Sequence, residues 1–128
     1  MFHKPPKDSG VDFDELARLT AHDRELGDEL LRIFVDQSVA LFEEIRAASS
    51  KTADHRAKLP MLAHTLRGSA LAIGARAVAR AAEDCEHRSQ SREDLPIDLE
   101  LHQRLERSLD EALKSIAHHL HRAGGGRR

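Results

Sequence analysis

The segment from residue 61 to residue 75 contains a histidine whose neighbours suggest chemistry. It reads Met-Leu-Ala-His-Thr-Leu-Arg-Gly-Ser-Ala-Leu-Ala-Ile-Gly-Ala, with the histidine at position 64. At about 100° per residue of helix, the apolar stripe centres between Leu66 and Ala70, and His64 lies roughly 155° away from it. We therefore expect His64 to face solvent. A neutral imidazole keeps a lone pair on one ring nitrogen, which makes it a nucleophile.

The neighbours of His64 on the same helix face fit a group-transfer site. Gly68 follows one turn later, where a glycine costs about 1 kcal/mol relative to alanine, so its position calls for a reason. We interpret Gly68 as providing steric access to the imidazole. Arg67 would neutralise the oxygens of a phosphoryl group. Met61 and Leu71 would form an apolar rim on which a partner protein docks.

This segment resembles the signature of the histidine-containing phosphotransfer (HPt) family, His-x-Leu-Lys-Gly-Ser followed by a helix that ends at Gly-Ala. The matching residues here are His64, Leu66, Arg67, Gly68, Ser69, Gly74 and Ala75. Residues 27–34 also resemble the family's entry to its second helix, and Glu86 stands where a Leu-Glu pair usually ends the fourth. Two departures are Arg67 in place of lysine, which changes reach and geometry, and Cys85 in place of leucine, which we expect to be a packing change.

The resemblance implies a phosphorelay intermediate. A phosphoaspartate on a receiver domain would donate a phosphoryl group to His64, which would pass it to another receiver domain, of a hybrid histidine kinase or a response regulator. In this family the receiver brings the aspartate and Mg²⁺, so no cofactor of the chain's own is expected. Because the nucleotide-binding domain of a histidine kinase is absent, we expect no autophosphorylation from ATP.

Composition and periodicity predict an all-α fold, an antiparallel four-helix bundle with a short N-terminal capping helix. Aromatic residues make up 3 % of the chain, with no Trp or Tyr, and apolar residues recur at helical spacing. Asp12 and Glu15 resemble a capping box at the start of the short helix. The first two expected helices cover residues 13–20 and 24–48. The third runs from near Leu59 to Ile73, the fourth begins after Gly74 and ends before Ser89, and the fifth runs from after Pro96 to about His121.

Two features of the expected fold concern its boundaries. Pro60 occupies the first turn of the third helix, or that helix begins near Asp54 and is kinked at the proline. We divide the chain into a flexible segment 1–11, a helical bundle 12–122 and a flexible tail 123–128, because proline and glycine discourage regular structure at both ends.

Charge and cysteine content exclude several classes. With 20 basic and 22 acidic residues, no global field favours binding to nucleic acid or to an anionic membrane. The single cysteine, Cys85, excludes an internal disulfide. No long apolar run or signal sequence is present, so we expect a cytoplasmic protein. We expect a monomer, because the apolar stripes can be buried within one chain.

Other interpretations remain at this point. One is an interaction module that binds a receiver or kinase without phosphotransfer, although it would not need His64. Another is a metal site at His118, His119 and His121, for which a solvated helix end is the simpler explanation. We likewise interpret Arg76, Arg80 and Arg88 as solvated charges, with Arg76 at the fringe of the docking surface.

Overall fold

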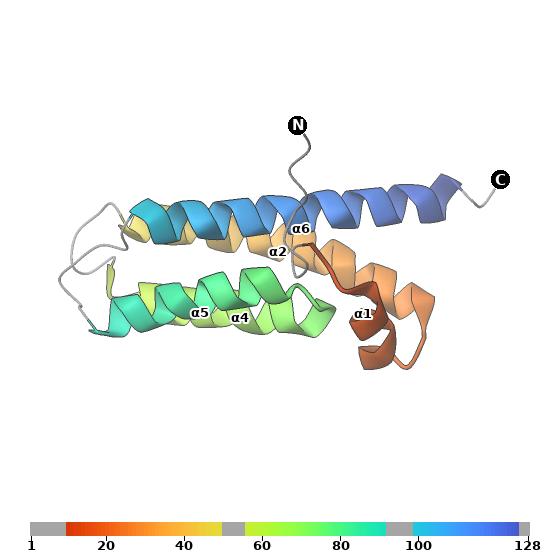
Figure 1. The fold of residues 1–128 in the computed structure, drawn as a ribbon, viewed down its shortest axis with the longest axis horizontal. Coiled ribbons are helices and arrows are strands. Elements are labelled where there is room, and N and C mark those ends of the chain that lie inside the picture. The colour runs from red at the N-terminus through yellow and green to blue at the C-terminus, as the bar shows by residue number, and fades with distance from the viewer. Residues whose placement is uncertain (1–9, 50–55, 92–98, 126–128) are drawn as a thin grey trace, which may run out of the picture.

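A computed structural model describes residues 10–49, 56–91 and 99–125 of the chain. All the secondary structure in these ranges is helical (Figure 1). The helices are α1 (Phe13–Leu19), α2 (Arg24–Ser49), α4 (Leu59–Ile73), α5 (Arg76–Ser91) and α6 (Leu99–Gly125). The prediction of an all-α protein is confirmed.

Four of the helices form an antiparallel bundle, and the short helix α1 covers one end of it (Figure 1). Helix α4 packs between α2 and α5, while α6 packs against both α5 and α2, so the four helices close around one core. The α4–α5 contact is the most extensive. Small side chains on the facing surfaces, such as Ala63, Ala70 and Ala82, are buried there and permit this close approach. No helix in the described ranges is long and apolar enough to cross a membrane.

The core contains the stripes that periodicity predicts, with one correction on α2. Phe34, Leu31 and Ile45 are almost completely buried, as are Leu105 and Ile116 of α6. Cys85 is buried with no exposed surface, as expected for a packing residue. Leu26, which helical spacing groups with the apolar stripe of α2, is instead 46 % exposed. It lies at the edge of the stripe, in the first turn of the helix, where no neighbouring helix covers it.

Helix α4 begins and ends at the residues that favour those positions. Pro60 lies in the first turn, where its missing N–H costs no hydrogen bond. The first of the two alternatives for Pro60 is therefore correct. At the other end Gly74 has φ +80°, and the N–H of Ala75 donates to the carbonyl of Ala70 at 2.9 Å. This is the Schellman arrangement, in which a left-handed residue closes the helix.

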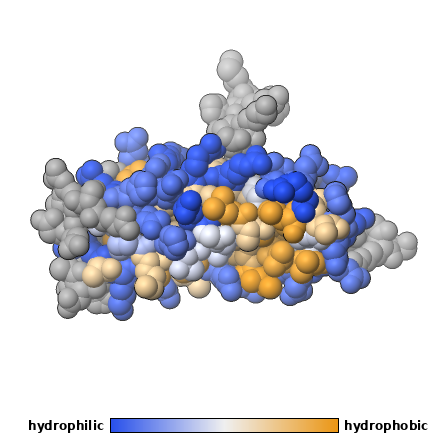
Figure 2. Space-filling model, turned by 90° about the horizontal axis from the view of Figure 1, so that it is seen from below, coloured by the Kyte–Doolittle hydropathy of each residue, from blue (hydrophilic) through white to orange (hydrophobic). Residues whose placement is uncertain are grey.

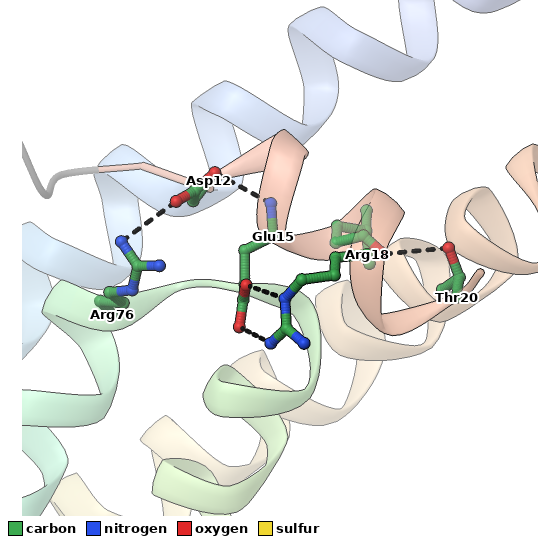
Figure 3. A network of polar contacts seen from close by, with 6 residues as sticks. Asp12, Glu15, Arg18, Thr20 and Arg76 are labelled. Carbon is green, nitrogen blue, oxygen red and sulfur yellow. Dashed lines mark hydrogen bonds and ion pairs between the residues drawn. The ribbon is translucent and has the colours of Figure 1, made fainter. Parts of the chain in front are cut away.

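Polar contacts attach α1 to the turn between α4 and α5 (Figure 3). The Asp12 carboxylate accepts a hydrogen bond from the backbone N–H of Glu15 at 3.0 Å and also pairs with Arg76 at 3.0 Å. The Asp12 N–H donates to the carbonyl of Gly74. Arg76 is thus a tertiary contact, and the prediction that it is only solvated was wrong.

The capping box predicted at α1 is only half formed. The Glu15 side chain turns away from the helix start and accepts two hydrogen bonds from Arg18, at 2.9 and 2.8 Å. This pair lowers the pKa of Glu15 and raises that of Arg18. Both side chains are at the surface, where such a pair adds little to stability.

Several boundaries differ from those expected. Helix α5 continues past Ser89, whose hydroxyl donates to the carbonyls of Cys85 and Glu86 and so does not break the helix. Helix α6 continues to Gly125, beyond the expected end near His121. Gly10 and Val11, which we assigned to the N-terminal segment, are buried, and the Val11 N–H donates to Ser115 Oγ. The remaining residues of the two segments expected to be flexible, 1–9 and 126–128, lie outside the described residues.

Candidate functional site

His64 lies near the middle of α4 on the face that points away from the core. Its side chain is 64 % exposed, in agreement with the predicted orientation. The imidazole contacts the neighbouring helix α5, where its Nδ1 atom lies 3.2 Å from Oε2 and 3.4 Å from Oε1 of Glu86. The Glu86 side chain is only 15 % exposed, so it is held against the bundle while the imidazole projects from it.

The contact with Glu86 determines which ring nitrogen is available. A carboxylate only accepts hydrogen bonds, so the Nδ1 atom of His64 must carry the proton in this contact. In a neutral ring the lone pair is then on Nε2. The arrangement therefore orients the ring and leaves Nε2 as the nucleophilic atom. Sequence reasoning placed Glu86 at the end of a helix but gave it no role, because its contact with His64 spans 22 positions.

The surface beside His64 is open at Gly68. A Cβ atom built at Gly68 would meet no atom within 4 Å outside the backbone of its own helix. Close packing against another helix, the main structural reason for a glycine here, is therefore excluded. Arg67 lies on the α5 side of His64 by helical geometry. Its guanidinium has no ion pair within the described ranges and is available to a ligand.

Exposed apolar side chains surround this part of α4. Met61 is 75 % exposed and Leu71 is 46 % exposed, and both lie on the His64 side of α4. Figure 2 shows an apolar area on the side of the molecule where α4, α5 and α1 lie. The helices adjoining α4 also carry exposed large apolar residues, to which the sequence assigned no role at the surface. They are Leu19 on α1 and Leu26 and Ile33 on α2.

The two exposed residues of α2 lie on the side that adjoins α4. Leu26 and Ile33 are seven positions apart, so they share one side of the helix. Asp28 contacts α6 through His119. On α2, Asp28 lies roughly 160° around the helix from Leu26 and roughly 140° from Ile33. Since α2 packs between α4 and α6, Leu26 and Ile33 lie toward α4. We call Leu19, Leu26, Ile33, Met61 and Leu71 the apolar surface.

The histidines near the C-terminus form no metal centre within the described residues. His118 and His121 are exposed, as predicted for a solvated helix end. His119 is different, because its Nε2 atom lies 3.1 Å from Asp28 and its ring stacks on Phe13 with the centroids 4.4 Å apart. It is a packing residue that joins α6 to α2 and α1.

The fold and the site define a class, an all-helical bundle with a surface histidine whose ring is oriented by a carboxylate. The family model of the Hpt domain matches residues 29–116, and the chain belongs to the Hpt domain family. No curated protein and no solved structure matches it. Hpt domains take part in His–Asp phosphorelays and interact with receiver domains of kinases and response regulators.

Proposed function

We propose that this protein carries a phosphoryl group on Nε2 of His64, accepts it from the phosphoaspartate of one receiver domain and passes it to the aspartate of another. The observation that carries this proposal is the His64–Glu86 contact on an open helix face. It combines a proton fixed on Nδ1 with an exposed lone pair on Nε2. An imidazole that served only as a polar surface group would need neither feature.

The transfer is a single displacement at phosphorus. The Nε2 lone pair forms the N–P bond, the bond from phosphorus to the aspartyl oxygen breaks, and the aspartate leaves as a carboxylate. Glu86 accepts from Nδ1–H throughout and stabilises the positive charge that develops on the ring. Arg67 would donate to the equatorial oxygens. In-line transfer requires mainly positioning and charge neutralisation, and the receiver domain would supply the aspartate and Mg²⁺.

The apolar surface is the proposed docking area for the receiver domain. Its five residues lie on α1, α2 and α4, around the helix that carries His64. Burial of exposed leucine, isoleucine and methionine side chains supplies binding free energy without a need for specific polar partners. The vacancy at Gly68 would then let the receiver backbone approach the imidazole. Neither the Mg²⁺ nor any other cofactor need be bound by this chain, and we place its function in the cytoplasm.

A phosphotransfer assay tests this proposal. A receiver domain labelled with ³²P on its aspartate, in the presence of Mg²⁺, should transfer the label to this protein. A second, unphosphorylated receiver should then remove it. If labelled receivers bind the protein but never label it, the chain is an interaction module instead.

Replacement of Glu86 should slow transfer through the orientation of the ring. Glu86→Ala removes a hydrogen bond to a charged group, which is worth about 1.5 to 3 kcal/mol, so we expect the rate to fall by roughly 10- to 150-fold. Glu86→Gln retains an acceptor and should recover part of the rate. The imidazole ¹⁵N spectrum provides a second measurement, because Glu86→Ala should lose the preference for a proton on Nδ1. A tautomer population equal to that of the wild type would contradict the positioning role.

A larger side chain at Gly68 should raise the stability of the protein and lower its rate of phosphotransfer. Gly68→Gln introduces a better helix former at an exposed position and should stabilise the fold by up to about 1 kcal/mol. It also places a long side chain one turn from His64, so transfer should slow by roughly tenfold or more. Gly68→Ala is the matched control, which should give the stability gain with little loss of rate. Equal transfer rates in the wild type and Gly68→Gln would remove the steric argument.

A further inference from the structure

A surface cavity lies away from His64, at the end of the bundle that α1 covers. Its volume is about 390 Å³, and its lining residues come from the first turns of α1 and α2 and the last turns of α6: Phe13, Arg24, Ser115, His118, His119 and Arg122. Figure 1 shows that the start of α2 and the end of α6 meet at this end of the molecule. The volume is within the range of small-ligand pockets, roughly 300 to 1,000 Å³.

Two arginines line this cavity, and within the described ranges no ion pair neutralises them. Two histidines also line it, of which His119 is hydrogen-bonded to Asp28, and none of its described lining residues is acidic. The arginines, Arg24 and Arg122, have no ion pair with any residue in the described ranges. Arg24 also lines the neighbouring cavity, together with Asp23 and Asp28. The Asp28 carboxylate is hydrogen-bonded to His119, and Asp23 Oδ1 accepts the N–H of Leu26. Two guanidinium groups beside one concavity favour the binding of an anion there.

Stabilisation of the α6 terminus does not explain the arrangement. Cations in the last turns of a helix favourably oppose its dipole, which accounts for Arg122. The dipole of α6 gives no reason for the position of Arg24, because Arg24 belongs to α2 and lines the same cavity. The convergence of cationic side chains from α2 and α6 is the feature that points to a ligand.

We propose that this cavity binds a small phosphate-type dianion, inorganic phosphate or a phosphate monoester. Arg24 and Arg122 supply planar guanidinium donors from two sides, the geometry that suits a tetrahedral oxyanion. Ser115 Oγ accepts the N–H of Val11, so its hydroxyl proton is available to donate to the ligand. Phe13 stacks on His119 and forms the apolar wall. The cavity is larger than a phosphate requires, which leaves room for an organic substituent.

Titration of the full chain with two probes tests this site without reference to phosphotransfer. Inorganic phosphate and phenyl phosphate are added at constant ionic strength while the ¹H–¹⁵N NMR spectrum is recorded. We expect saturable shifts of the backbone amides around Phe13, Ser115 and His119 with a stoichiometry of one. Tighter binding of phenyl phosphate would assign the site to a monoester, and equal binding would assign it to free phosphate.

A matched pair of double variants supplies the control. Arg24→Gln with Arg122→Gln removes two exposed charges that line the cavity, and should weaken binding at least about tenfold without lowering the melting temperature. Arg32→Gln with Arg107→Gln removes two exposed charges from the same helices outside the cavity, and should bind like the wild type. Equal weakening in both double variants, or no saturation in the wild type, would overturn the proposal.

Discussion

His64→Gln should gain no phosphoryl label from a receiver domain that labels the wild-type protein. Glutamine keeps the polarity and approximate length of the side chain but has no nucleophilic nitrogen. Because His64 is exposed and belongs to no core contact, the variant should fold like the wild type and melt at a similar temperature. The expected loss is complete within the sensitivity of the assay, since no other group takes over the attack.

The matched control is His87→Gln, on α5. His87 is exposed and follows Glu86 directly, so its side chain points about 100° around α5 from that of Glu86. This variant should be labelled at the wild-type rate. Arg67→Ala should still be labelled, but more slowly, because the loss of one charge-assisted contact costs about 1.5 to 3 kcal/mol in the transition state.

The chemistry of the label gives an independent check. A phosphoryl group on imidazole nitrogen is a phosphoramidate, which is labile in acid and stable in base. A label on serine would show the reverse pattern. Labelling of His64→Gln at the wild-type rate, or an acid-stable label on the wild type, would show that both the assigned residue and the proposed chemistry are wrong.

The fold was predictable because helices carry a local signal. Apolar residues at helical spacing located the five helices, and Gly74 marked the end of α4 correctly. The exposure of His64 followed from the angle between that residue and the stripe of its own helix. Such properties depend on residues within a few turns of each other, and a single sequence contains that information.

Contacts between helices were not predictable in the same way. The Glu86 carboxylate reaches His64, and Arg76 reaches Asp12, only because the bundle sets particular helices side by side. His119 shows the same limit, since its stacking on Phe13 joins residues more than 100 positions apart. Periodicity indicates which face of a helix is buried, but not which neighbour it meets.

The exposed apolar residues show a related limit. Leu26 belongs to the stripe of α2 by spacing, yet it lies in the first turn, next to the short helix α1. Spacing alone does not show whether a neighbouring element covers the first turn of α2, so the exposure of this apolar residue was not predictable.

The glycine that ends α4 should be the position least tolerant of an added methyl group. Gly74 has φ +80°, a conformation that costs other residues about 1 to 2 kcal/mol. A Cβ atom there would lie 2.8 Å from the backbone oxygen of Asp12, which cannot move without breaking the hydrogen bond between the Asp12 N–H and the Gly74 carbonyl. We expect Gly74→Ala to destabilise the protein by more than about 2 kcal/mol and to lower its melting temperature by roughly 10 °C.

Gly27→Ala is the matched control, since it adds the same methyl group at the end of the first turn of α2. Its Cβ atom would lie 3.7 Å from the side chain of Leu16, an ordinary van der Waals distance, and its backbone conformation is helical. Alanine is the better helix former by about 1 kcal/mol, so this variant should be as stable as the wild type or more stable. Thermal unfolding of both variants measures the difference. If Gly74→Ala melted at or above the temperature of Gly27→Ala, the close approach of α1 to the end of α4 would be incorrect.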